Sequence, residues 1–193
     1  MYDRAMARPK SEDKRNAIMA AAIHVIAAQG LAAPTATIAR EAGVANGSLF
    51  NYFETKADLV NQLYLELKLE VTAAAFDDLP AQGTLREQAF HVWHGWMQWA
   101  VANPDKRRAL ALLSVSDEIT PAYRERGRQA SANIAQILER ARANGPMRDQ
   151  PMPFFMALAE SLSCATMDYM IEHPDQAEQH SRAGFEALWR AMG

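Results

Sequence analysis

The sequence predicts an all-α protein of about nine helices. β-branched residues are scattered, and no stretch alternates apolar and polar residues as a half-buried strand does. Alanine, leucine, methionine, glutamate and arginine, which favour helices, dominate long stretches instead. Glycine and proline interrupt these stretches at intervals that suit helices of ordinary length.

Four helices are expected in the N-terminal part of the chain. Ser11 is the expected N-cap of the first helix, and Gly30 ends it. The second helix is expected to begin at Pro34 or Thr35 and to end at Gly43. Proline is tolerated at its start because the first turn of a helix needs no amide hydrogen there. The expected ranges are 11–29, 34–42, 46–52 and 56–76.

A connector at 77–84, which contains Pro80 and Gly83, separates these helices from five more. Each later break is marked by a proline or by glycine and proline together, and both end helices. The expected ranges are 84–102, 104–116, 121–144, 151–172 and 175–192.

Composition indicates a globular protein outside the membrane. Of the 193 residues, 49% are hydrophobic and 22% are charged, which argues against disorder. No apolar run approaches the roughly 18 residues that span a bilayer, and the first residues are too charged for a signal peptide. We therefore expect a cytoplasmic protein. Its single cysteine, Cys164, has no partner for an intramolecular disulfide.

The net charge of −3 is unevenly distributed along the chain. Residues 1–56 carry seven lysines and arginines against five acids, which leaves +2 there and −5 in the remainder. This asymmetry is compatible with an N-terminal module that meets phosphates.

Residues 35–53 have the pattern of a helix-turn-helix. Two short helices meet at a tight glycine turn, and apolar residues such as Ile38, Leu49 and Phe53 supply their inner contacts. Small polar groups on the outside of the second helix can reach base edges in the major groove, and Tyr52 and Lys56 suit phosphates. These outer residues are Asn46, Gly47, Ser48 and Asn51. The alternative is that they form an ordinary solvated helix face.

The segment IAREAGVANGSLFNYFETKADL resembles the signature of the TetR/AcrR family of repressors, and the resemblance covers about residues 11–63. It implies an N-terminal three-helix DNA-binding domain at 1–55 and a C-terminal helical ligand-binding and dimerisation bundle at 56–193. The helix at about 56–76 would link the two.

The resemblance also implies residue roles. Thr35 and Ala36 would lie against DNA at the foot of the second helix, and Lys56 would hold the DNA backbone. Many relatives have a longer or charged residue where Ala36 stands, so base reading at that position is in doubt, and Arg40 fits either DNA or solvent. The remaining implied contacts are Asn46, Gly47, Ser48, Asn51 and Tyr52.

The first residues carry two further expectations. Arg8 and Lys10 fit either a basic arm beside the groove or a flexible charged tail. The segment from Met6 to Lys14 resembles the start of an efflux-related repressor of the family, so Met6 is the expected natural start and residues 1–5 an upstream extension.

The helix at 84–102 carries three tryptophans and Met97, which together offer a flat, polarizable wall for a small hydrophobic or aromatic effector. The alternative is that these side chains are simply core. The resemblance matches Trp93 and Phe155 to effector-binding positions, and Tyr64 is a candidate third wall. The stretch just before Phe155, Pro151-Met152-Pro153, lacks the acidic residue expected opposite a cation, which puts a strong preference for cations in doubt. The candidate effector set is Tyr64, Trp93, Trp96, Met97 and Phe155.

The last two helices are apolar over broad faces, more than a monomer usually exposes. In the family these helices pair with their symmetry mates, so a homodimer would place two reading helices roughly 34 Å apart on a palindrome. The candidate interface residues are Phe154, Leu158, Leu162, Phe185, Leu188 and Trp189.

No catalytic, cofactor or metal motif stands out, and the five histidines are dispersed. The leading hypothesis is a repressor of multidrug efflux or its activator, which binds double-stranded DNA as a dimer and is released by a small molecule. The alternatives are a small-molecule-binding helical protein without regulation and an architectural DNA-binding protein of the same fold.

Overall fold

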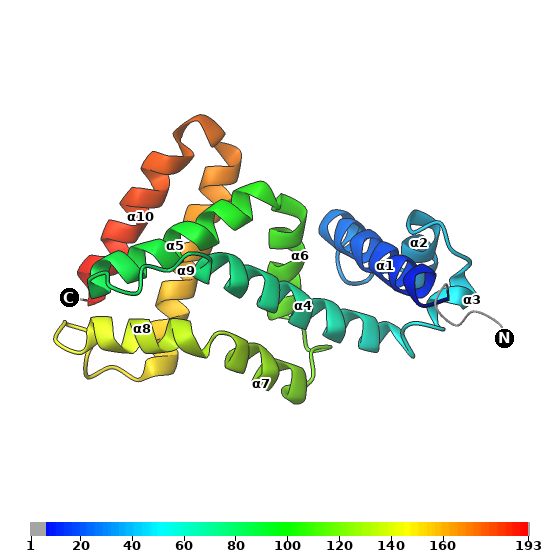
Figure 1. Ribbon diagram of the computed structural model, residues 1–193, viewed down its shortest axis with the longest axis horizontal. Helices are drawn as coiled ribbons and strands as arrows, with labels where there is room; N and C mark the ends of the chain where they lie inside the picture. Colours follow the sequence, from blue (N-terminus) through cyan, green and yellow to red (C-terminus); the bar gives the residue numbers. More distant parts are fainter. Residues whose placement is uncertain (1–6, 193) are drawn as a thin grey trace. The chain divides into compact units, whose positions relative to one another are not determined.

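A computed structural model describes the backbone of residues 7–192 and the side chains of residues 11–192 (Figure 1). Within these residues it contains ten α-helices, one short 3-10 helix (η1) and no strand, which confirms the predicted fold class. None of the described helices is both long and apolar enough to cross a membrane. The expectations for residues 1–5, and for the side chains of Arg8 and Lys10, lie outside the described part. The elements are α1 (Ala7–Gln29), α2 (Thr35–Glu41), α3 (Asn46–Leu49), α4 (Lys56–Phe76), α5 (Leu85–Ala102), α6 (Pro104–Ser114), α7 (Pro121–Ala130), α8 (Ala132–Arg142), α9 (Met152–Glu172), η1 (Pro174–Gln176) and α10 (Ala177–Met192).

The described residues fall into two compact units. The first comprises the chain up to Leu67 together with Asp105–Arg126, and the second comprises Lys68–Pro104 and the chain from Gly127 onward. Helix α4 therefore contributes its first half to one unit and its second half to the other. The predicted division into residues 1–55 and 56–193 remains a prediction; the compact units group Asp105–Arg126 with the N-terminal part of the chain.

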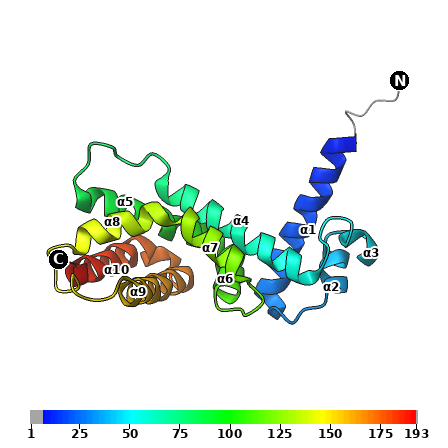
Figure 2. The same cartoon turned by 90° about the horizontal axis from the view of Figure 1, so that it is seen from below.

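In the first unit, α1 packs on α2 and α2 packs on α3 (Figure 2). The apolar stripe of α1 is buried, as are the inner residues of both short helices and of the start of α4. The largest fully buried side chains of this unit include Ile18, Ile26, Ile38, Leu49, Phe53, Leu59 and Leu63.

In the second unit, α5 lies at the centre and packs on α8, α9 and α10, and α9 and α10 also pack on each other (Figures 1 and 2). Thr84 begins α5 with a capping box, in which its hydroxyl accepts a hydrogen bond from the Glu87 amide and the Glu87 carboxylate accepts one from the Thr84 amide. The hydrogen bonds from the backbone and then the side chain of Thr84 lower the pKa of Glu87.

Several helix boundaries differ from the sequence-based expectations. Helix α1 begins at Ala7, so Ser11 lies inside the helix and is not its N-cap; Pro9 falls in the first turn, where proline is tolerated. The helix expected at 121–144 is divided at Ser131, whose amide is shared between the carbonyl oxygens of Gly127 and Arg128. Glycine and serine at this junction weaken the helix enough for it to break.

Gly95 sets how closely α5 approaches α4 within the second unit. A Cβ atom at this position would lie 2.7 Å from the Ala74 carbonyl oxygen and 3.0 Å from the Ala75 Cα atom. Both are backbone atoms, so the helices must separate to accept a methyl group. One turn further along α5, the Trp99 indole Nε1 donates a hydrogen bond of 2.9 Å to the Glu70 carboxylate.

We expect the substitution Gly95→Ala to lower the free energy of unfolding by about 1 to 3 kcal/mol, because the added methyl group overpacks this helix crossing. Urea denaturation at fixed protein concentration measures the change. Gly47→Ala is the matched control, because a Cβ there meets nothing within 4 Å. An unfolding midpoint for Gly95→Ala equal to that of the parent protein would show that the crossing is not tightly constrained.

Candidate nucleic-acid interface

A tight turn joins α2 to α3. The Gly43 amide donates to the Arg40 carbonyl oxygen at 3.1 Å, and the Val44 amide donates to the Ala39 carbonyl oxygen at 2.9 Å. Gly43 has a φ of 66°, in the left-handed region that favours glycine. The turn thus has the geometry expected of a helix-turn-helix.

Helix α3 is shorter than predicted, because it ends at Leu49 and not at Tyr52. The amides of Tyr52 and Phe53 both donate to the Leu49 carbonyl oxygen, at 3.0 and 3.2 Å. The chain closes there in a tight turn, which brings the fully buried Phe53 into the core. Burial of Phe53 thus accounts for the early end of the helix.

None of the nine residues predicted to contact nucleic acid is buried. Five of them are exposed: Ala36, Arg40, Asn46, Gly47 and Asn51. The other four are partly exposed: Thr35, Ser48, Tyr52 and Lys56. Their positions on α2, on α3, in the turn that follows and at the start of α4 leave them open to a partner molecule.

Lys56 has a structural contact that the sequence did not suggest. Its ammonium Nζ donates a hydrogen bond of 2.5 Å to the Leu31 carbonyl oxygen, which ties the start of α4 to the α1–α2 connection. An ammonium group carries three donors, so this bond leaves capacity for a phosphate.

Sequence reasoning missed Phe50, whose side chain is 43% exposed at the end of α3. Leu49 and Phe53 are four residues apart and both point inward, which leaves Phe50 on the outer side beside Asn51. The apolar pair Leu49 and Phe53 was the signal in the sequence from which an outward-facing Phe50 could have been predicted.

Arg15 of α1 holds α4 in place beneath this surface. Its guanidinium forms an ion pair of 2.5 Å with Glu66 and a hydrogen bond of 2.9 Å with Gln62. The same group lies over the Phe53 ring, 5.5 Å from its centroid. Arg15 therefore links α1, the end of the helix-turn-helix and α4.

Asn61 fixes the first half of α4 to the connection between α6 and α7. It is 3% exposed; its Nδ2 donates to the Glu118 carbonyl oxygen at 2.9 Å, and its Oδ1 accepts from the Thr120 amide at 2.9 Å. Nδ2 also donates to the Ala57 carbonyl oxygen. The buried side-chain amide thus hydrogen-bonds the Glu118 carbonyl oxygen and the Thr120 amide, which lie in a connection outside any helix.

The predicted effector residues are mostly internal. Tyr64 belongs to the first unit and the other four belong to the second, where Trp96 is the one that is partly exposed. Trp93 donates its indole Nε1–H to the Ser181 carbonyl oxygen at 2.9 Å, so this N–H already has a partner within the chain. The exposed fractions of the buried four are 5% for Tyr64, 4% for Trp93, 0% for Met97 and 1% for Phe155.

The predicted pairing residues divide into two groups. Phe154 and Leu158 are 51% and 47% exposed on α9, whereas Phe185 and Leu188 of α10 are 2% and 7% exposed. Phe185 and Leu188 thus contribute to the core of their own chain. Leu162 and Trp189 are partly exposed.

Tyr169 extends the exposed apolar part of α9, and the sequence-based set omitted it. Its side chain is 48% exposed and stacks on the His173 ring at a centroid distance of 4.1 Å. Within the described residues, no group of three or more histidine, cysteine, aspartate or glutamate side chains is placed to hold a metal ion.

Comparison with known proteins identifies relatives of the chain. Residues 18–63 match the family described as bacterial regulatory proteins, tetR family. The whole fold is similar to that of a TetR-family transcription regulator from Shewanella sp. PV-4, with 32% sequence identity and a TM-score of 0.83. The match covers 93% of this chain and 97% of that one.

Two more distant structures contain small molecules. FadR from Bacillus subtilis, in complex with stearoyl-CoA, is 18% identical, with a TM-score of 0.68 over 92% of this chain and 98% of that one. LfrR from Mycobacterium smegmatis, in complex with proflavine, is 20% identical, with a TM-score of 0.69 over 91% and 95%. These identities show a shared fold and nothing more.

We expect Asn61→Leu to lower the free energy of unfolding by about 1 to 3 kcal/mol, because it removes the partner of the Glu118 carbonyl oxygen and of the Thr120 amide. Urea denaturation measures the loss, and Asn133→Leu on the exposed face of α8 is the control, expected to change stability by less than about 0.5 kcal/mol. Equal losses in the two variants would contradict the role assigned to Asn61.

Proposed function

Because the chain belongs to the TetR family of bacterial regulatory proteins, we propose that it is a repressor that binds a palindromic operator as a homodimer and leaves it when a small molecule binds. TetR-family regulators are DNA-binding transcription factors and not enzymes. The observation that carries the proposal is the helix-turn-helix, whose inner face is buried while its outer residues stay open.

The outer residues of α2 and α3 have the chemistry of a DNA-reading surface. Asn46, Ser48 and Asn51 offer hydrogen bonds to base edges, and Gly47 lets the backbone approach closely. Thr35 and Ala36 lie at the start of α2, where backbone amides favour a phosphate. Tyr52, Lys56 and Arg40 are proposed to contact the DNA backbone.

We add Phe50 to this surface. An exposed aromatic side chain beside polar residues on a reading helix suits contact with the methyl group of thymine. The operator half-site is therefore expected to contain a thymine near the end of α3.

Two copies are proposed to pair through α9. Phe154, Leu158 and Leu162 recur at four-residue spacing on one stripe of this helix, and Tyr169 extends it. On α10, Trp189 contributes at the edge, with Phe185 and Leu188 packed behind it. A twofold pair would place the reading helices about one helical turn of DNA, roughly 34 Å, apart.

We propose that the segment up to residue 55 reads DNA, that the rest receives the effector and the second copy, and that α4 couples them. The proposed effector is an aromatic or amphipathic molecule beside Tyr64, Trp93, Trp96, Met97 and Phe155. Release requires that the effector bind the DNA-incompetent arrangement more tightly, because equal affinity for both arrangements shifts nothing. The bound ligands of FadR and LfrR support a small-molecule effector.

The resemblance of Met6–Lys14, Trp93 and Phe155 to the repressor RamR suggests control of multidrug efflux or of its activator. Such a regulator would act in the cytoplasm, where bacterial DNA lies. An adjacent, divergently oriented gene for an efflux pump or its activator would agree with this assignment.

We expect Asn51→Ala to weaken binding to a palindromic fragment from the upstream region of the protein's own gene by about 1 to 3 kcal/mol, because hydrogen bonds to a base are lost. Fluorescence anisotropy of labelled DNA at several salt concentrations measures the affinity, which should fall as salt rises.

Asn133→Ala, on the exposed face of α8, is the matched control and should leave the affinity unchanged. Melting temperatures of both variants should equal that of the parent protein. Failure of the parent protein to bind any promoter-derived fragment at low salt would refute the proposal itself, whereas unchanged binding by Asn51→Ala would refute only the assigned contact.

We expect Leu158→Arg to convert the dimer to a monomer, because pairing would bury one unpaired arginine from each copy in an apolar surface. Sedimentation velocity measures the species, and operator affinity should fall more than about tenfold. Val115→Arg is the control: Val115 is 80% exposed between α6 and α7 and belongs to the first compact unit, whereas α9 belongs to the second. Retention of the dimer by Leu158→Arg would exclude α9 as the interface.

A further inference from the structure

Where the structure describes burial, at residues 11–192, the buried charged side chains are all positive. Among the residues whose burial the structure describes, Arg107 and Arg142 are the charged side chains that are buried, at 7% and 6% exposure. No aspartate or glutamate in that part of the chain is buried. The electrostatic interaction between a charged ligand and a buried charged side chain is strong because the protein interior screens charge weakly. The sign of the buried charges therefore affects which effectors can bind.

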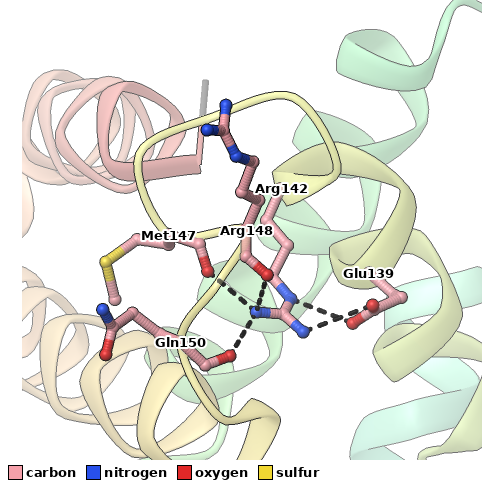
Figure 3. A network of polar contacts seen from close by, with 5 residues as sticks. All are labelled: Glu139, Arg142, Met147, Arg148 and Gln150. Carbon is pink, nitrogen blue, oxygen red and sulfur yellow. Dashed lines mark hydrogen bonds and ion pairs between the residues drawn. The ribbon is translucent and has the colours of Figure 1, made fainter.

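Arg142 is held rigidly at the end of α8 (Figure 3). Its Nη1 donates to three backbone carbonyl oxygens in the α8–α9 connection: those of Met147 at 2.8 Å, Arg148 at 3.3 Å and Gln150 at 2.7 Å. Its Nε and Nη2 donate to the two carboxylate oxygens of Glu139 at 2.9 and 3.2 Å. The guanidinium therefore has little freedom to move away when a ligand binds.

The ion pair between Arg142 and Glu139 has its positive end inside the protein. The side chain of Glu139 is 57% exposed and that of Arg142 is 8% exposed. Water screens the carboxylate more than the guanidinium, so the carboxylate does not fully cancel the internal charge.

The same guanidinium lies over the ring of Phe155, 5.8 Å from its centroid, and Phe155 is 1% exposed. A cation is already attracted to the electron-rich face of this ring. A cationic effector that used Phe155 as an aromatic wall would have to approach beside Arg142, with repulsion between two like charges and no buried carboxylate to offset it.

We infer that the effector of this regulator is an anionic or uncharged amphipathic molecule, and that Arg142 lowers the affinity of the effector site for cations. The inference rests on the proposed function, because it assigns a charge class to the proposed effector site around Phe155. Among the aromatic effectors proposed above, the inference excludes a strong preference of the site for cations.

The first experiment compares probes of one shape and different charge with the unaltered dimer. At mildly alkaline pH, proflavine is cationic, acridine is uncharged and acridine-9-carboxylate is anionic; decylammonium and decanoate form a matched aliphatic pair. Equilibrium dialysis gives each dissociation constant. We expect each anion to bind at least about tenfold more tightly than its matched cation, which corresponds to about 1.4 kcal/mol.

Two variants locate the source of this preference. Arg142→Met removes the charge and should bring the anion-to-cation affinity ratio toward one. Glu139→Gln removes the compensating carboxylate and should raise the ratio. Arg140→Met, at an exposed position on the same helix, should leave it unchanged. A purely structural role for Arg142 would weaken all probes together without changing the ratio, and the opposite shifts of the two variants remain measurable if Arg142→Met is less stable.

The outcomes separate this inference from the proposed function. Cations that bind as tightly as the matched anions, or ratios that stay constant in Arg142→Met and Glu139→Gln, would overturn the inference alone. Operator binding without measurable binding of any probe of either charge would refute effector control, and the inference with it.

Discussion

The burial of Leu49 and Phe53 is the constraint on which the reading surface depends. Helix α3 spans four residues, far too few to be stable by its own hydrogen bonds, so packing must hold it. Leu49 and Phe53 are both fully buried, and the Leu49 carbonyl oxygen accepts the amides of Tyr52 and Phe53. With its inner side fixed in this way, α3 can present small polar residues outward without needing any of them for stability. Stability and recognition are thereby divided between opposite faces of one short segment.

Helix α4 is fastened separately at each half. Its first half is held within the first compact unit by the buried amide of Asn61 and by the contacts of Arg15. Its second half is tied to α5 by the close approach at Gly95 and by the hydrogen bond from Trp99 to Glu70. A continuous helix resists bending, so a displacement of one half is transmitted to the other half. The proposed coupling between effector and operator would depend on this continuity of α4.

The sequence predicted the fold class and the positions of most helices because proline, glycine and apolar spacing are local signals. It misplaced the end of α3 and did not anticipate the break at Ser131, since both depend on packing and backbone bonding that no local pattern encodes. The nine residues predicted to contact DNA were chosen from their place in a short motif, and none of them is buried. The burial of Phe185 and Leu188, and the position of the Arg142 guanidinium over Phe155, depend on contacts between distant helices, and periodicity alone could not reveal them.

The distribution of tryptophan allows fluorescence to report on one compact unit without the other. All four tryptophans, Trp93, Trp96, Trp99 and Trp189, belong to the second compact unit, whereas the unit that contains the helix-turn-helix has tyrosine as its largest aromatic side chain. Selective excitation of indole therefore reports on the second unit and not on the unit that contains the helix-turn-helix. Indole emission recorded during chemical denaturation would follow the unfolding of the second unit alone, while circular dichroism would follow the unfolding of both units. Any gap between the two curves would measure directly how cooperatively the two units unfold.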